Sequence, residues 1–187
     1  IAEIAALNSE YNAQGQNFRL IAGNEVDILK DGSLDFDDEI LDELDYVVAS
    51  VHNAMTLSES DMTDRIIRAV QNPHVTMLGH LTGRLLLKRE PYAVDVAAVI
   101  EACAETRTII ELNCSPWRLD MDWRWWKFAK EKGVKCSINP DAHRASSLEY
   151  LWFGARIARK GWLTRRDVVN TLTRHEIEAF LDLDPVS

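Results

Sequence analysis

The sequence lacks several features that define large classes of proteins. It has no apolar run of about 18 residues, so no membrane-spanning helix is expected. No G-x-S-x-G, G-x-G-x-x-G or P-loop motif occurs, which leaves a serine-hydrolase triad and the common nucleotide-binding loops without support. The three cysteines (Cys103, Cys114 and Cys136) form no C-x-x-C pair. This scatter predicts small core residues in a reduced, cytoplasmic protein.

Positive charge is also scarce. Lys and Arg number 21 against 30 Asp and Glu, which gives a net charge of -9 and a pI near 5.0. Nucleic-acid binding draws its affinity mainly from cations on phosphates, so this chain is not expected to grip a duplex unaided. The negative charge is still compatible with a nucleic-acid enzyme that binds its substrate mainly through another module.

The length of 187 residues fits one domain, over residues 1–187. A content of 47% hydrophobic residues, with six Trp, is enough to form a core. The chain opens at Ile1 in a helix-like pattern, with no leader-like segment. We therefore expect it to be an excerpt of a longer protein.

Apolar strand-like runs alternate with helix-like segments along the chain. The expected strands are 18–29 (ending near Glu25), 45–52, 75–80, 108–113 and 134–139. The expected helices are 1–13, 36–44, 58–72 with Ser58 as N-cap, 93–106, 122–133, 147–160 and 164–172, followed by a turn or short helix in the tail 175–187. This alternation is typical of parallel strands covered by helices, in a barrel or in an open doubly wound sheet.

Polar side chains recur at one point of successive strand–helix units. They are separated by 27, 28, 33 and 28 residues, close to the length of one unit, and are Glu25, His52, His80, Asn113 and Asp141. That point is the carboxyl end of each strand, where α/β proteins carry their chemistry. His143 follows two residues after the last of them.

A set of carboxylates and three imidazoles suits zinc, manganese or iron better than calcium. Ligands from several strands indicate more than one ion, an arrangement that fits phosphoester hydrolysis. Each residue also has a plainer interpretation. A single His at a strand end is usually structural, and Asp141 would serve as a helix cap. Arg84 and Arg118 suit either a phosphate contact or a structural ion pair, and Asn113 suits a hydrogen bond to a metal-bound neighbour.

Five segments carry a resemblance to a known family. They are "GNEVDILKDGSLDF", "LDYVVASVH", "LGHLTGR", "ELNCSPWRLDMD" and "DAHRASSLEYLWFGARIARKGWLTRRDVVNTL". In order and spacing, over about residues 18–172, the chain resembles the C-terminal PHP (polymerase and histidinol phosphatase) domain of bacterial and archaeal family X DNA polymerases.

The resemblance implies a distorted seven-stranded β/α barrel of the PHP type, with parallel strands and outer helices. It implies two or three divalent metal ions and hydrolysis of DNA 3' ends, as a 3'-5' exonuclease or 3'-phosphatase, in gap filling during base excision repair. By motif, Glu25 would bridge metals, His52 and His80 would be imidazole ligands, and Asp141 and His143 would close the site. Glu25, Asp141 and His143 would then be catalytic, and Arg84 and Arg118 would face substrate phosphate.

The family opens its barrel with an H-x-H motif that is absent here, where the first histidine is His52. The resemblance therefore implies a partial barrel without its first β/α units and an incomplete metal site. Its partner would be DNA, held through upstream polymerase modules, and its open edge would favour a homo-oligomer. Two other functions stay open: a small-molecule phosphatase of the histidinol-phosphate type, and a non-catalytic scaffold.

Overall fold

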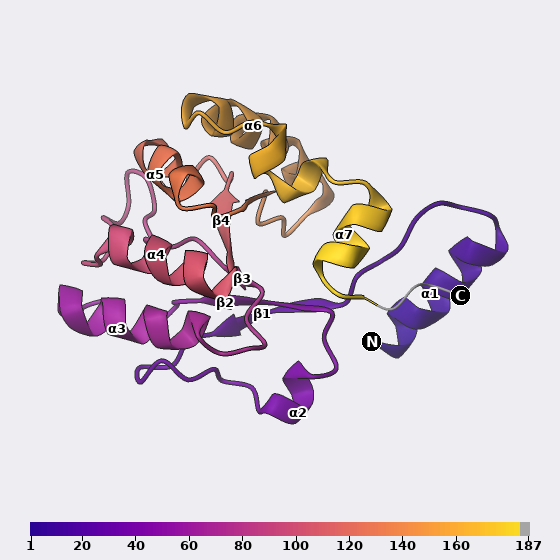
Figure 1. The fold of residues 1–187 in the computed structure, drawn as a ribbon, viewed down its shortest axis with the longest axis horizontal. Coiled ribbons are helices and arrows are strands. Elements are labelled where there is room, and N and C mark those ends of the chain that lie inside the picture. The colour runs from indigo at the N-terminus through magenta and orange to yellow at the C-terminus, as the bar shows by residue number, and fades with distance from the viewer. Residues whose placement is uncertain (184–187) are drawn as a thin grey trace.

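The computed structural model describes residues 1–183, which form a parallel five-stranded sheet with helices on its outer side (Figure 1). The strands are β1 (Gly23–Asp27), β2 (Tyr46–Ser50), β3 (Met77–Leu78), β4 (Ile109–Asn113) and β5 (Cys136–Asn139). Every neighbouring pair is parallel. The predicted α/β class with parallel strands is therefore confirmed.

The strand order is β1-β2-β3-β4-β5, so each strand lies beside the one that follows it in the chain. A doubly wound sheet reverses its order at a switch point, whereas a barrel proceeds in one direction. The observed order has the direction of a barrel, and β1 and β5 do not pair within residues 1–183. Five strands are described where the resemblance implies seven, so closure into a PHP barrel stays a prediction.

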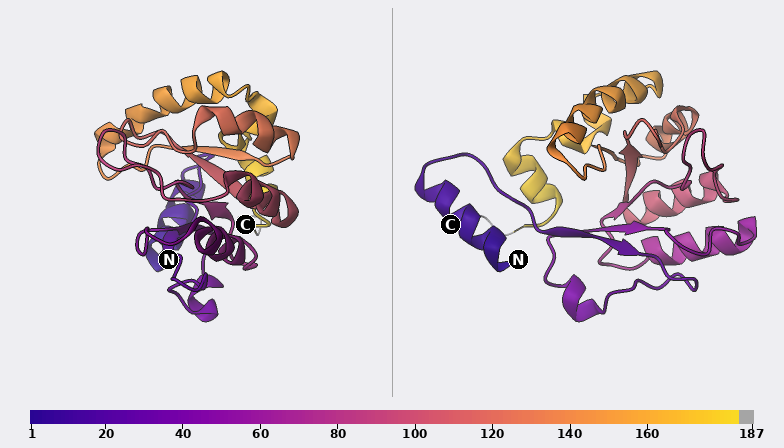
Figure 2. Two further views of the ribbon diagram at one scale, coloured as in Figure 1. Left: turned by 90° about the vertical axis from the view of Figure 1, so that its left-hand side faces the viewer. Right: turned by 180° about the vertical axis from the view of Figure 1, so that it is seen from behind.

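Helices follow one another round the outside of the sheet (Figures 1 and 2). The α-helices are α1 (Ala2–Ala13), α2 (Asp38–Leu41), α3 (Glu59–Val70), α4 (Val96–Thr106), α5 (Trp126–Glu131), α6 (Leu151–Lys160) and α7 (Arg174–Phe180). Short 3₁₀ helices are η1 (Trp123–Trp125), η2 (Ala145–Tyr150), η3 (Arg165–Asp167) and η4 (Val169–Thr171). Contacts of α3 with α4 and of α4 with α5 form the outer layer.

The main hydrophobic core lies between the strands and these helices. Trp126, Met62 and Ile66 are among its fully buried side chains. A small second cluster of Met77, Ile109 and Val169 lies apart from it. All three cysteines are free and buried, as predicted.

Helix α1 buries no residue and stands away from the sheet in both figures. The Asn8 side chain connects this helix to the following segment. Its Nδ2 group donates to the Leu20 carbonyl, and its Oδ1 atom accepts from the Leu20 backbone N–H. In the described part of the chain, no helix combines the length and apolar character needed to cross a bilayer.

One strand end is close to its prediction and one predicted helix is wrong. The strand expected to end near Glu25 ends at Asp27, two residues later. The helix expected over 164–172 is instead the pair of 3₁₀ turns η3 and η4. There the Asn170 side chain accepts from the Ile138 amide and donates to its carbonyl, beside the parallel bridge between Cys136 and Val168 on the outer edge of β5. The Thr171 hydroxyl also donates to the carbonyls of Arg165 and Val168, and local side-chain hydrogen bonds of this kind compete with a helix.

The tail prediction is confirmed as far as the structure goes. Helix α7 covers Arg174–Phe180, within the expected segment 175–187 apart from its first residue. Residues 184–187 lie outside the described part of the chain.

Candidate metal centre

Three of the predicted ligands converge at the carboxyl ends of the first three strands. Glu25 lies within β1, while His52 and His80 each follow the end of a strand by two residues. The Glu25 Oε1 atom lies 3.4 Å from His52 Nε2 and 3.2 Å from His80 Nε2. One ligand atom from each residue lies within 4.8 Å of the others, the only such group among residues 1–183. The spacing along the sequence therefore corresponds to proximity in space.

Local backbone structure sets the position of His80. Strand β3 contains only two residues, and Gly79 follows it directly. A side chain on Gly79 would collide with the Ser50 hydroxyl at the end of β2, so only glycine allows this close approach. The His80 amide then donates to Glu111 Oε2 at 2.7 Å, and the His80 side chain is only 3% exposed.

A second carboxylate orients His52. Asp27 Oδ1 lies 2.5 Å from His52 Nδ1, so Asp27 and Glu25 hold the two ring nitrogens between them. The hydrogen bond with Glu25, and then the one with Asp27, raises the pKa of His52 to about 9 against the effect of burial. A carboxylate that accepts the distal ring proton is the common outer partner of a metal-bound His.

The residues present fit a transition-metal ion. Ligands at about 2.1 Å from a tetrahedral ion lie about 3.4 Å from one another, which matches the Glu25 distances of 3.2 and 3.4 Å. The buried His80 Nδ1 has no hydrogen-bond partner among the described residues. Its Nε2 faces Glu25, so this nitrogen is the one placed to bind an ion together with the carboxylate.

Asp141 and His143 are not part of this group of ligand atoms. Asp141 Oδ2 instead faces Arg118 Nε at 3.4 Å and Asn113 Nδ2 at 3.2 Å. The His143 side chain is 85% exposed, and its Nδ1 lies 3.0 Å from the Asp141 carbonyl oxygen. Their role as ligands stays a prediction, whereas the predicted hydrogen bonding of Asn113 to a candidate ligand is observed.

The two candidate phosphate contacts differ. Arg84 donates to the carbonyls of Arg118 and Leu119 and forms an ion pair with Asp122 at 3.1 Å, so each of its three nitrogens has a protein partner. Arg118 pairs with Asp141 through Nε and leaves a buried NH1 group without a partner among the described residues. A structural role therefore suits Arg84, and the phosphate contact of Arg118 stays a prediction.

Glu111, which is buried on β4 within the site, was not among the residues predicted from the sequence. Burial raises its pKa, while the charge of His80 and the hydrogen bond from the His80 amide oppose this effect. A signal existed: Glu111 precedes Asn113 by two residues, so both side chains lie on the same face of the strand. The outer partner Asp27 shares a face with Glu25 for the same reason.

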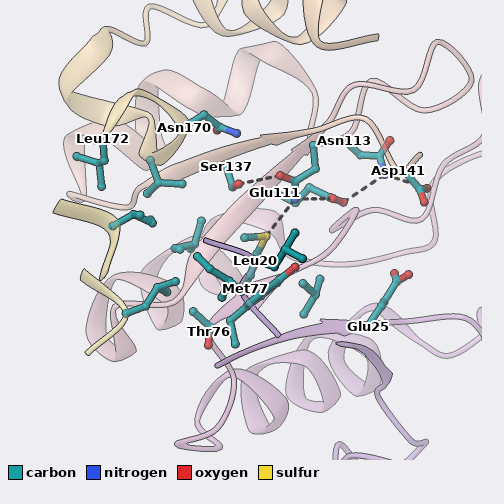
Figure 3. A pocket seen from close by; sticks show the side chains of 18 of the residues that line it. Leu20, Glu25, Thr76, Met77, Glu111, Asn113, Ser137, Asp141, Asn170 and Leu172 are labelled. Carbon is teal, nitrogen blue, oxygen red and sulfur yellow. Dashed lines mark hydrogen bonds between the residues drawn. The ribbon is translucent and has the colours of Figure 1, made fainter. Parts of the chain in front are cut away.

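Four residues of the site, Glu25, Glu111, Asn113 and Asp141, line one cavity of about 630 Å³. Figure 3 shows Glu25, Glu111, Asn113 and Asp141 around it, with hydrogen bonds linking the last three. Apolar residues such as Met77 and Leu172 line the rest of the cavity. It has room for a substrate group beside the candidate ligands.

Comparison with known proteins gives two kinds of relatives. Over 179 residues, or 96% of its length, the chain is 41% identical to the DNA polymerase/3'-5' exonuclease PolX of Bacillus subtilis (strain 168). It covers 31% of that protein, in its C-terminal part. No family model matches the chain.

Further relatives are named as probable phosphatases. One from Thermoanaerobacter sp. (strain X514) is 30% identical over 83% of this chain and 65% of its own length. One from Clostridium acetobutylicum is 32% identical over 66% of this chain and 52% of its own length. The chain thus spans less than two thirds of each of these relatives.

Proposed function

We propose, from the premise that this chain is a relative of the C-terminal part of family X DNA polymerases, that it is a metal-dependent phosphoesterase acting on DNA 3' ends. The reactions assigned to it are 3'-5' exonuclease and 3'-phosphatase cleavage, in gap filling during base excision repair. The seven-stranded PHP barrel belongs to the same proposal. Because the chain carries a net charge of -9, polymerase modules would supply most of the affinity for DNA.

One observation carries the proposal: the convergence of His52 Nε2 and His80 Nε2 on Glu25 Oε1 at the carboxyl edge of a parallel sheet. Nothing in the packing of a strand end requires these three side chains to meet. Like the apolar cavity beside them, they suit a site that binds an ion and a substrate phosphate.

Each residue has a defined part in the proposed reaction. Two or three zinc, manganese or iron ions would supply an activated water and neutralise charge on phosphate oxygens. Glu25, His52 and His80 would hold an ion, and Asp141 and His143 would complete the site from beyond β5. Arg118, which pairs with Asp141, would contact a substrate phosphate oxygen, where charge grows during cleavage.

A small-molecule phosphatase is the second candidate. The relatives named as probable phosphatases, at 30% and 32% identity, favour it. An acidic surface also disfavours a polyanion more than a small phosphate ester. The metal chemistry would be the same, so only the substrate separates the two candidates.

The test compares substrates on the purified chain supplied with zinc, manganese or iron. Release of phosphate from 3'-phosphorylated DNA, of nucleotides from single-stranded DNA, and of phosphate from histidinol phosphate would be measured. Glu25→Gln should lower the rate of DNA hydrolysis by more than about 100-fold. Replacing even a residue that only hydrogen-bonds to a metal ligand typically lowers metal affinity or activity by about 10- to 100-fold. Glu43→Gln, an exposed residue after α2, makes the same charge change as a control.

Hydrolysis of histidinol phosphate without hydrolysis of DNA would replace the first candidate by the second. Equal activity in Glu25→Gln and the unaltered chain would refute the assignment of the site. Absence of both metal binding and hydrolysis would overturn both candidates and favour a scaffold.

A further inference from the structure

Strand β4 separates two groups of candidate ligands but contributes none itself. Glu25, His52 and His80 come from β1 to β3, and Asp141 and His143 follow β5. At the same level, β4 instead carries Glu111 and Asn113, which are 6% and 0% exposed. A buried carboxylate is costly unless donors surround it, so its presence here needs a reason beyond packing.

Toward the first group, Glu111 holds the backbone that carries His80. Its Oε2 atom accepts the His80 amide at 2.7 Å, and its Oε1 atom accepts Asn139 Nδ2 at 3.0 Å. The amide contact spans 31 residues of sequence and fixes the residue whose imidazole faces Glu25. At 2.7 Å, the amide contact is at the short end of the range for N–H···O hydrogen bonds.

Toward the second group, Asn113 connects Glu111 to Asp141 by hydrogen bonds. Its Nδ2 group donates to Glu111 Oε2 at 3.3 Å and to Asp141 Oδ2 at 3.2 Å. Its Oδ1 atom accepts the Ser115 amide at 3.1 Å, so the NH₂ end of the side chain must face the two carboxylates. One amide therefore bridges the two carboxyl groups (Figure 3).

We propose that Glu111 is a positioning residue that joins the two halves of the metal site, acting on His80 through its backbone amide and on Asp141 through Asn113. The inference rests on the proposed function, because it assigns a purpose to residues around the same site. Glu111 touches neither metal nor substrate in this role. It sets the separation between the ligands on β1 to β3 and those beyond β5, and thereby the ions that the site accepts.

The test uses Zn²⁺ or Mn²⁺ alone, with affinity measured by competition against a chromophoric chelator on the full chain. Glu111→Gln keeps the shape but turns an NH₂ group toward donors, and should lower metal affinity by about 10- to 100-fold. Asn113→Ala should lower affinity less, by several-fold. Ser137→Ala is the matched control: it pairs with Glu111 in register and bonds Asn139, but touches neither His80 nor Asp141.

The double variant Glu111→Gln with Asn113→Ala tests whether the hydrogen bonds from His80 to Asp141 act as one network or as two separate contacts. In one network the double variant should have the metal affinity of Glu111→Gln alone, because the effects of neighbouring contacts are not additive. Multiplied losses would overturn the proposal, as would unchanged affinity in Glu111→Gln. A shift of the His80 amide resonance in the ¹⁵N spectrum of Glu111→Gln, but not of Ser137→Ala, is the second expected result.

Failure of this inference is distinct from failure of the proposed function. If the unaltered chain binds no metal, both are overturned. If it binds metal and hydrolyses 3' ends while Glu111→Gln matches Ser137→Ala, only the positioning role is refuted. If Glu111→Gln does not fold, Asn113→Ala decides: an affinity equal to that of Ser137→Ala refutes the proposal.

Discussion

The Glu25 carboxylate lies between two imidazoles, and this position keeps it ionised. Hydrogen bonds from His52, and then from His80, hold the pKa of Glu25 well below its usual range, although burial acts in the opposite direction. The same contact raises the pKa of His52 to about 9. In the metal-free chain both groups are therefore charged at neutral pH, and a bound metal must displace the proton of His52.

Replacing Asp27 by Asn tests the orientation of His52. Because Asp27 accepts from Nδ1, its loss should lower the pKa of His52 from about 9 toward the ordinary value of 6.5, measured by NMR titration of the imidazole without metal. Metal affinity should fall by about 10- to 100-fold. Asp35→Asn makes the same charge change on a side chain that contacts the Asp27 amide, and should alter neither quantity. An unchanged His52 pKa in Asp27→Asn would contradict the assignment.

Asp122 gives a prediction about acid stability. Burial would raise its pKa, but hydrogen bonds from Arg124 and then from Arg84 outweigh this effect and hold it at about 2. A carboxyl group whose pKa is lowered by folding stabilises the folded state at any pH above its ordinary pKa of 3.8. This stabilisation is lost as the pH falls toward 2.

Asp122→Asn should therefore lower the free energy of unfolding by about 1 to 2 kcal/mol at pH 7. The difference from the unaltered chain should shrink between about pH 4 and pH 2, as measured by urea unfolding. Asp64→Asn, an exposed change on α3, is the control. A difference that stays constant with pH would show that charge on Asp122 has no part in it.

Among the elements, α3 shows how a helix of the outer layer is specified locally. The Ser58 hydroxyl accepts from the Asp61 amide at 3.1 Å, which confirms the predicted N-cap. Met62, Ile66 and Ala69, at spacings of four and three residues, bury one face against the sheet and α4. The cap and the apolar stripe are both readable from the sequence.

Ser58→Ala should destabilise the protein by about 1 kcal/mol, because it leaves an amide of the first turn without its acceptor. Thermal unfolding measures the loss. Ser60→Ala, two residues further on and exposed, removes a hydroxyl that caps nothing and should leave stability unchanged or slightly higher. Equal losses in the two variants would show that the cap contributes nothing.

For the whole molecule, the order of the strands decides where the chemistry lies. Successive parallel strands bring their carboxyl ends to one edge, so residues 27 or 28 apart in sequence become neighbours there. If an ion binds this edge in the folded state only, it must stabilise the entire fold by mass action.

At a metal concentration of 100 times Kd, the stabilisation should be about 2.7 kcal/mol, or about 5 to 10 °C in Tm for a chain of this size. Differential scanning calorimetry with zinc or manganese would measure the shift, and a chelator should reverse it. His52→Ala should lose the shift while keeping most of the metal-free stability, because its side chain is 38% exposed. The same shift in His52→Ala would mean that the ion binds elsewhere.

The sequence by itself determined the alternation of parallel strands with helices and the common position of Glu25, His52 and His80. Both follow from periodicity and from the length of a β-α unit, which are local properties. The resemblance in the motifs added the relation to family X polymerases, and the comparisons bear it out. Strand ends were less well predicted, as Asp27 and the turns η3 and η4 show.

Only the tertiary structure decided which side chains meet. The contact of Asp27 with His52 spans 25 residues and that of Glu111 with the His80 amide spans 31, so each depends on strand register. Tertiary structure also satisfied every nitrogen of Arg84 and turned Asp141 toward Arg118 and Asn113. A sequence places residues at the same level of a sheet, but the choice of partner depends on the direction and length of side chains that meet only after folding.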